Sequence, residues 1–220
     1  KTVFFENTAN AQEFVNRKIV SQEKTTVLHG AGVDVQAYSY QAYPENACVH
    51  FLYLGRIMKE KGMDELLDAC EQLHQEGYSF VLDLVGFFED AYKQRINQLS
   101  AQGIVVFHGF QQEPRPFYAA CDCVVLPSYH EGMSNVLLEA AATGRPVITS
   151  DIPGCREAVV DQKSGLLVPK GDAQALYQAM KHMLSIDRVQ REQMGLAGRK
   201  WIKQQFSKEQ VVRETKNALM

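Results

Sequence analysis

Short, fully apolar runs alternate with segments whose apolar residues recur every three or four positions. The runs predict strands at residues 49–54, 80–85, 104–107, 124–126, 147–149 and 166–168. The periodic segments predict helices at 63–76, 89–102, 114–120, 135–143, 173–184, 188–205 and 208–219. Strands that are apolar throughout and alternate with helices are typical of a parallel sheet covered on both faces. The pattern therefore predicts a doubly wound α/β layer with extra helices after it.

A separate strand, helix and strand open the chain. Residues 2–5 and 25–28 are predicted strands, and residues 9–18 a helix with Thr8 as its N-cap. A glycine-rich turn at residues 29–34 follows and leads to the regular alternation.

Glycines and polar residues come directly after the predicted strands. In chain order they are Gly55–Arg56, Gly86, Gly109, the stretch 128–131 and Ser150–Asp151. Parallel sheets bind ligands at the carboxyl ends of their strands, so these residues are expected to share one cleft.

The stretch 128–148 is the most informative part of the chain. A helix is expected to begin at Ser134 or Asn135 and to end before Gly144, with Glu131 in the preceding loop and Glu139 inside the helix. The first amides of a helix are unpaired and, with the helix dipole, form an anion site. An anion site between two carboxylates suggests a ligand that carries both phosphate and hydroxyl groups, as a nucleotide sugar does.

Composition narrows the function classes. The chain has 220 residues and a net charge of −3, which argues against a broad nucleic-acid surface. Its five cysteines are odd in number and fit no disulfide or metal framework, so reduced buried thiols are expected. The six histidines form no metal-ligand spacing, and neither Asp-x-Asp nor Gly-x-Gly-x-x-Gly occurs. We therefore expect no metal and no nicotinamide or other cofactor.

These motifs resemble those of a known family. Glu131 and Glu139, eight positions apart with Gly132 between them and Gly144 beyond, resemble the signature of retaining GT-B glycosyltransferases of family 4. Further matches in family order are Gly55–Arg56 with Lys61–Gly62, Gly109, and the stretch 165–169. The resemblance covers roughly residues 27–206 and only the carboxyl-terminal, donor-binding half of such an enzyme. The stretch 153–157 is similar to a variant in bacterial enzymes that build surface polysaccharides on lipid-linked carriers.

The resemblance implies a fold and a domain division. The expected fold is a Rossmann-like doubly wound parallel sheet, one half of a GT-B glycosyltransferase, with extra carboxyl-terminal helices. Residues 1–36 would be a remnant of the amino-terminal GT-B domain and linker, and residues 37–220 the nucleotide-sugar-binding domain. The alternative is that residues 1–36 are an ordinary extra strand and helix of a single domain.

The resemblance also implies roles for single residues. Glu131 would lie beside the transferred sugar as the catalytic residue, and Glu139 would accept hydrogen bonds from the ribose. Those implied to hold the donor phosphates are Arg56, Lys61, Gly132, Met133, Ser134 and Asn135, the last four through backbone amides. Phe110 and Gln111 would lie near the base.

The implied function is transfer of a sugar, with retention of configuration, from a UDP-sugar to a glycan or lipid-linked acceptor in polysaccharide biosynthesis. The implied partners are the donor, the acceptor and the missing amino-terminal domain, without which this chain is expected to be inactive. We expect a cytoplasmic protein that the missing domain could bring to the inner membrane face. Two alternatives stay open: a non-catalytic nucleotide-sugar-binding module, and a GT-B epimerase or phosphorylase.

Three aromatic residues leave packing alternatives open. Phe88 could narrow the cleft or pack on the neighbouring helix, and packing is favoured. Trp201 and Phe206 could either face a partner domain or lie in the core of this one.

Overall fold

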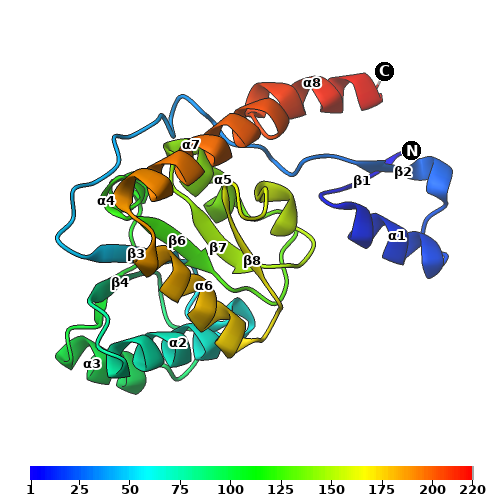
Figure 1. Ribbon diagram of the computed structural model, residues 1–220. Helices are drawn as coiled ribbons and strands as arrows, with labels where there is room; N and C mark the ends of the chain where they lie inside the picture. The colour runs from blue at the N-terminus through cyan, green and yellow to red at the C-terminus, as the bar shows by residue number, and fades with distance from the viewer. Residues whose placement is uncertain (220) are drawn as a thin grey trace.

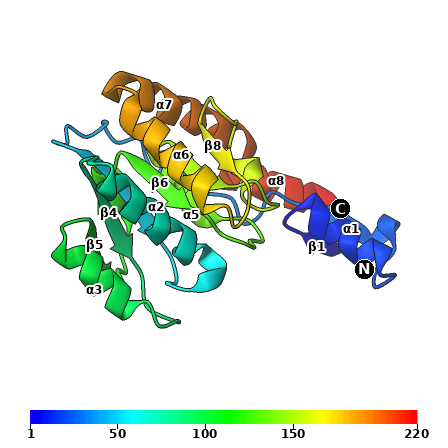
Figure 2. The same ribbon diagram turned by 60° about the horizontal axis from the view of Figure 1, so that its bottom comes forward.

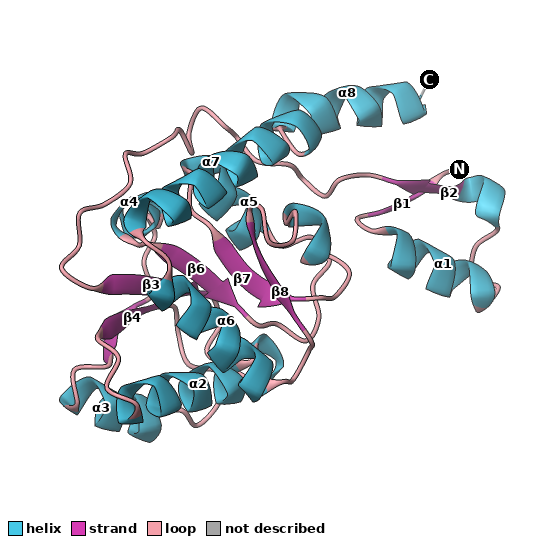
Figure 3. Ribbon diagram, in the orientation of Figure 1, coloured by secondary structure: helices cyan, strands magenta, loops and turns pink. Residues whose placement is uncertain are grey.

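The computed structural model describes residues 1–219, which form one large parallel sheet between helices and a small unit at the amino terminus (Figures 1 and 3). The strands are β1 (Val3–Phe5), β2 (Thr25–Val27), β3 (Val49–Leu54), β4 (Phe80–Val85), β5 (Val105–Gly109), β6 (Cys123–Leu126), β7 (Val147–Ser150) and β8 (Gly165–Val168). The helices are α1 (Thr8–Asn16), α2 (Met63–Gln75), α3 (Lys93–Ala101), α4 (Arg115–Ala120), α5 (Asn135–Thr143), α6 (Ala173–Ser185), α7 (Arg188–Gln205) and α8 (Lys208–Leu219). One-turn 3-10 helices are η1 (Gln22–Lys24), η2 (Lys59–Lys61) and η3 (Arg156–Ala158).

The large sheet is parallel throughout and has the strand order β5-β4-β3-β6-β7-β8. Helices α2 and α3 lie on one side of it and α4, α5 and α7 on the other, while α6 packs against α2 (Figures 1 and 2). The predicted doubly wound fold is thereby confirmed. The strand order reverses between β3 and β6, and in such sheets the ligand crevice opens at this point.

The apolar runs form the core, as their composition predicts. Every residue of β6 and β7 is buried, and Phe51 and Leu52 of β3 have no exposed surface. Strands buried on both faces cannot alternate apolar and polar residues, because both sides of the pleat meet a helix.

Two predicted helix boundaries were wrong. The N-cap of α1 is Asn7 and not Thr8, because the Asn7 side chain accepts a hydrogen bond from the Asn10 amide. Helix α3 begins at Lys93 and not near residue 89. The amide of Glu89 donates to the Ile57 carbonyl at 3.1 Å, and Ile57 pairs with Phe88 in a parallel bridge, so this segment stays extended.

Residues 1–28, which we call the amino-terminal unit, stand apart from the large sheet (Figure 1). Strands β1 and β2 pair in parallel, and α1 connects them. Helix α8 extends from the end of α7 toward this unit, and His29 Nδ1 lies 3.0 Å from Glu214 Oε2 on α8 (Figures 1 and 2). The predicted domain division at residue 36 stays a prediction.

The aromatic residues that the sequence left open pack within the chain. Phe88 lies against Phe107, with ring centroids 4.8 Å apart. Phe206 is buried, and Trp201 packs on the core while its Nε1 donates to the Glu157 carbonyl. Within residues 1–219, no helix has the length and apolar character needed to cross a membrane.

Candidate functional site

The turn after β3 and the loop after β6 meet where the strand order reverses. The turn ends in η2 and Gly62, whose φ of +71° lies in the left-handed region. A Cβ atom at Gly62 would overlap the Pro127 carbonyl, so only glycine allows the two segments to approach this closely. This contact places Lys61 beside residues 128–134, which we call the site loop.

Lys61, Ser128 and Glu131 form a compact polar cluster at this junction. Lys61 Nζ lies 2.6 Å from Glu131 Oε1, and Ser128 Oγ donates to the same oxygen at 2.8 Å. The side chains of Lys61 and Glu131 are only 16% and 15% exposed. Two residues that the sequence assigned to phosphate and to catalysis are therefore in direct contact.

Arg56 has a different partner. Its Nη1 lies 3.0 Å from Glu89 Oε2, and both side chains are at the surface. Glu89 was not among the predicted site residues. It reaches Arg56 because the segment after β4 stays extended alongside the turn after β3.

Glu139 lies on α5 and has different hydrogen-bond partners from Glu131. Tyr118 Oη donates to its Oε2 at 2.8 Å. Burial raises the pKa of Glu139, although hydrogen bonds from Tyr118 and Tyr38 oppose this rise. Burial and the Glu139 charge in turn raise the pKa of Tyr38 to about 12. Glu139 lines a cavity of about 210 Å³ together with Asn135 and Lys208, which is large enough to admit part of a ligand.

The site loop is held from two sides. The Gly132 carbonyl accepts a hydrogen bond from Asn7 Nδ2 at 2.8 Å. The Ser134 amide donates to the Gly154 carbonyl at 2.8 Å, so the amide that the sequence assigned to a ligand already has a partner. Met133 is buried, and its side chain packs against Gly30.

Within residues 1–219, the amino end of α5 has no side-chain cap. Helix α5 begins at Asn135, which is exposed, and the N-cap residue Ser134 makes no capping bond with its side chain. The first amides of the helix are thus free of side-chain acceptors in the part of the chain that the structure describes, as an anion site requires.

Phe110 and Gln111 follow β5 at the same edge of the sheet. Phe110 is 68% exposed, and its ring lies 6.3 Å from that of Phe87 in an edge-to-face arrangement. Gln111 donates from Nε2 to the His108 carbonyl, so its side chain is tied to its own turn. Both residues are accessible from the strand ends, where the resemblance places a base.

Sequence reasoning missed the residues that brace the site loop. Asn7 comes from the amino-terminal unit, 125 positions before Gly132, and no local signal marks it. Gly154 has a φ of +86°, and a Cβ atom there would overlap the Gly132 carbonyl. The glycine in the stretch 153–157 is the one sequence signal for this close approach.

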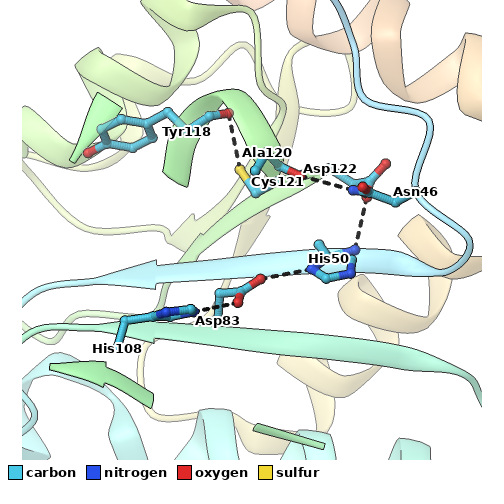
Figure 4. Close-up of polar contacts among 8 residues, drawn as sticks. All are labelled: Asn46, His50, Asp83, His108, Tyr118, Ala120, Cys121 and Asp122. Carbon is cyan, nitrogen blue, oxygen red and sulfur yellow. Dashed lines mark hydrogen bonds and ion pairs between the residues drawn. The ribbon is translucent and has the colours of Figure 1, made fainter. Parts of the chain in front are cut away.

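The fold also brings together two histidines that are far apart in the sequence, His50 and His108. Asp83 accepts from His50 Nδ1 at 2.9 Å and lies 2.7 Å from His108 Nε2, so one carboxylate links β3, β4 and β5 (Figure 4). Asp122 supports the same region by accepting hydrogen bonds from the His50 amide and from Asn46 (Figure 4). No group of three or more His, Cys, Asp or Glu residues within residues 1–219 has the geometry of a metal site.

Comparison with known proteins agrees with this arrangement. The family model of the glycosyl transferases group 1 matches residues 48–185. The capsular polysaccharide biosynthesis glycosyltransferase CapM of Staphylococcus aureus is 32% identical over 160 residues, which are 70% of this chain and 41% of that protein. The lipopolysaccharide core biosynthesis glycosyltransferase LpsE of Rhizobium meliloti is 32% identical over 158 residues, 72% of this chain and 46% of that protein. The chain thus spans less than half of either relative.

Solved structures show the same fold. Sucrose-phosphate synthase from Thermosynechococcus elongatus has a TM-score of 0.84 and 26% identity, over 99% of this chain and 57% of that one. Anabaena Alr3699/HepE, solved in complex with UDP and glucose, has a TM-score of 0.85 and 22% identity, over 99% of this chain and 62% of that one. These neighbours confirm the predicted Rossmann-like half of a GT-B fold. Because the family model covers more than half of its length, the chain belongs to the glycosyl transferases group 1.

Proposed function

We propose that this chain binds the nucleotide-sugar donor, a UDP-sugar, of a retaining family 4 glycosyltransferase. The observation that carries the proposal is the position of Lys61 and Glu131. They meet at 2.6 Å where the strand order reverses, beside the amino end of α5. A cation, a carboxylate and open helix amides at one point suit a ligand with a diphosphate and a sugar.

The proposed chemistry needs charge stabilisation and no redox step. Arg56 and Lys61 would stabilise the negative charge on the departing diphosphate, each contact contributing about 1.5–3 kcal/mol. Glu131 would stabilise positive charge that develops at the anomeric carbon, as a fixed carboxylate can in a partly dehydrated site. Glu139 would accept hydrogen bonds from the ribose hydroxyls in the cavity that it lines.

The relatives support the choice of donor and pathway. HepE was solved with UDP, and TarM of S. aureus with UDP and α-GlcNAc-glycerol. CapM and LpsE take their names from polysaccharide biosynthesis. The proposed acceptor is accordingly a glycan or a lipid-linked saccharide, bound by the part of the protein outside this chain. The chain alone would hold the donor and transfer little or no sugar.

The first test is calorimetric titration of this chain with UDP, GDP and ADP in metal-free buffer. We expect saturable UDP binding that is weakened about tenfold or more in Arg56→Ala, because one charge-assisted contact is lost. Arg17→Ala is the matched control, since Arg17 is a surface arginine at the carboxyl end of α1 that also pairs with a single glutamate. Absence of UDP binding, or equal weakening by both variants, would overturn the proposal.

A second test addresses the reaction. In the intact protein, Glu131→Ala should abolish sugar transfer. The product of the unmodified enzyme should keep the anomeric configuration of the donor, which proton NMR of the new linkage measures. Transfer that is unchanged by the substitution would remove Glu131 from the mechanism. An inverted product would contradict retention.

A further inference from the structure

Asn7 occupies an unusual place for the N-cap of a small peripheral helix. It is only 2% exposed, although most of the amino-terminal unit around it lies at the surface. Its Oδ1 accepts the Asn10 amide at 2.8 Å, which caps α1, and its Nδ2 donates to the Gly132 carbonyl at 2.8 Å. Capping α1 requires only an acceptor, so the second bond serves the site loop and not the helix.

The bond to Gly132 fixes the direction of a peptide plane. In a trans peptide, the C=O of one residue and the N–H of the next point in opposite directions. Within residues 1–219 there is no cis peptide, so the Met133 N–H points away from Asn7. Gly154 lies close to the same carbonyl, because a side chain there would overlap the Gly132 oxygen. The peptide is therefore clamped between two segments.

The Met133 N–H has no acceptor within residues 1–219. Met133 is nevertheless only 8% exposed. A backbone N–H without a partner in the protein costs free energy unless water or a ligand accepts its hydrogen. The next residue, Ser134, has no such free group, because its amide already donates to Gly154.

We infer that Asn7 is a positioning residue that keeps the Met133 N–H directed at the ligand of the site loop. This inference rests on the proposed function, in which that ligand is the donor diphosphate. It adds a role for the amino-terminal unit: the unit contributes no predicted donor contact itself, but it sets the orientation of a group that makes one. Adjacent Glu6 strengthens the link, because its carboxylate lies against Gly132 where a Cβ atom would be.

The decisive variant is Asn7→Ser. Serine caps a helix about as well as asparagine, but its side chain is too short to reach the Gly132 carbonyl. We expect UDP affinity to fall about tenfold, the equivalent of one hydrogen bond, with little change in the melting temperature. Asn16→Ser is the matched control, since it makes the same substitution in α1 at an exposed position. UDP binding by Asn7→Ser that equals that of the control would overturn the inference.

Asn7→Asp adds a readout that helix capping cannot produce. Aspartate keeps the cap but presents an oxygen to the Gly132 carbonyl until it is protonated. Its affinity deficit should therefore shrink between pH 7.5 and pH 5, because burial raises an aspartate pKa above its usual value of about 3.9. The deficit of Asn7→Ser should stay constant over this range. Parallel pH profiles for the two variants would contradict the proposed hydrogen bond.

A ligand-free measurement separates failure of this inference from failure of the proposed function. In the unliganded chain, Asn7→Ser should shift the amide NMR signals of Gly132 and Met133, whereas Asn16→Ser should leave them in place. If the wild-type chain binds no UDP but these shifts occur, the donor assignment fails and the positioning of the peptide stands. If the signals do not move, Asn7 does not position the loop.

Discussion

Lys61 and Glu131 contact each other across the point where the strand order reverses, with Lys61 Nζ 2.6 Å from Glu131 Oε1. One residue comes from the turn after β3 and the other from the loop after β6. Because both side chains are about five-sixths buried, solvent screens this pair less than it screens a surface pair. A phosphate that uses the Lys61 charge must therefore share it with Glu131.

Substitution of Lys61 should weaken UDP binding, whereas substitution of Glu131 should not. Lys61→Met removes the cation and leaves the Glu131 charge uncompensated, so we expect the Kd for UDP to rise about 30-fold or more. Glu131→Gln removes the competing charge, so the Kd should stay equal or fall a few-fold. Calorimetry on the two variants measures both effects. Equal weakening by both would show that the pair binds the ligand as one unit.

Release of Arg56 from Glu89 should also strengthen UDP binding. Exposed ion pairs contribute about 0–1 kcal/mol, so we expect Glu89→Gln to lower the Kd for UDP by about two- to fivefold at low salt. The gain should disappear at high ionic strength, because salt screens exposed charges. Glu76→Gln is the matched control, because the Glu76 side chain is 36% exposed, as that of Glu89 is, and also forms an ion pair, with Lys181. Glu76 follows the carboxyl end of α2, whereas Arg56 precedes its amino end. An equal gain in this control would assign the effect to net charge alone.

The sheet and the location of the site could be predicted because their signals are local. Strands buried on both faces appear as apolar runs, and the chain carries glycine where segments approach closely, as at Gly62. The spacing of Glu131 and Glu139 lies within one loop and helix, so a single sequence contains it. The structure brings the first of these carboxylates to Lys61, as a shared cleft requires.

The partners of the predicted residues could not be foreseen. Glu89 reaches Arg56 only because Phe88 forms a bridge with Ile57 and the Glu89 amide donates to Ile57, at the point where a helix was predicted to begin. Asn7 meets Gly132 from 125 positions away, and its type fits a helix cap equally well. Such contacts depend on tertiary packing that neither propensity nor periodicity encodes.

Replacement of Glu139 should separate ribose binding from phosphate binding. Glu139→Gln removes a charged acceptor, so we expect UDP affinity to fall about tenfold or more while affinity for inorganic pyrophosphate, which has no ribose, stays unchanged. Calorimetry with both ligands measures the difference. Equal losses for both ligands would place Glu139 beside the phosphates.

The same substitution should change how stability depends on pH. Burial raises the pKa of Glu139, so between the ordinary and the raised pKa the folded chain retains a proton that the unfolded chain has released. The free energy of unfolding therefore falls as pH rises through this window, and Glu139→Gln should remove that part of the fall. Urea unfolding at several pH values measures it. If the free energy of unfolding changed equally with pH in the two proteins, the raised pKa of Glu139 would be contradicted.

The contacts of Asp83 with His50 and His108 should contribute to stability and not to donor binding. Asn at this position can accept from only one of the two histidines, so Asp83→Asn should lower the free energy of unfolding by about 1 kcal/mol and the melting temperature by about 2–4 °C (Figure 4). UDP affinity should not change, because the three side chains are bound to one another and not to the Lys61 cluster. A loss of UDP affinity without a loss of stability would place this bridge in the site.

A single added methyl group should disturb the site most at the contact between Gly62 and Pro127. Gly62→Ala places a Cβ atom on the Pro127 carbonyl and also imposes a left-handed backbone on a non-glycine residue. The backbone effect alone costs about 1–2 kcal/mol. Gly77→Ala measures this backbone cost alone, because Gly77 has a φ of +84° and no atom within 4 Å of an added Cβ. We expect Gly62→Ala to lose clearly more stability in urea unfolding, and also UDP binding, since the turn that carries Lys61 must move away from the site loop. Equal stability losses at the two glycines would mean that the segments are not held in contact.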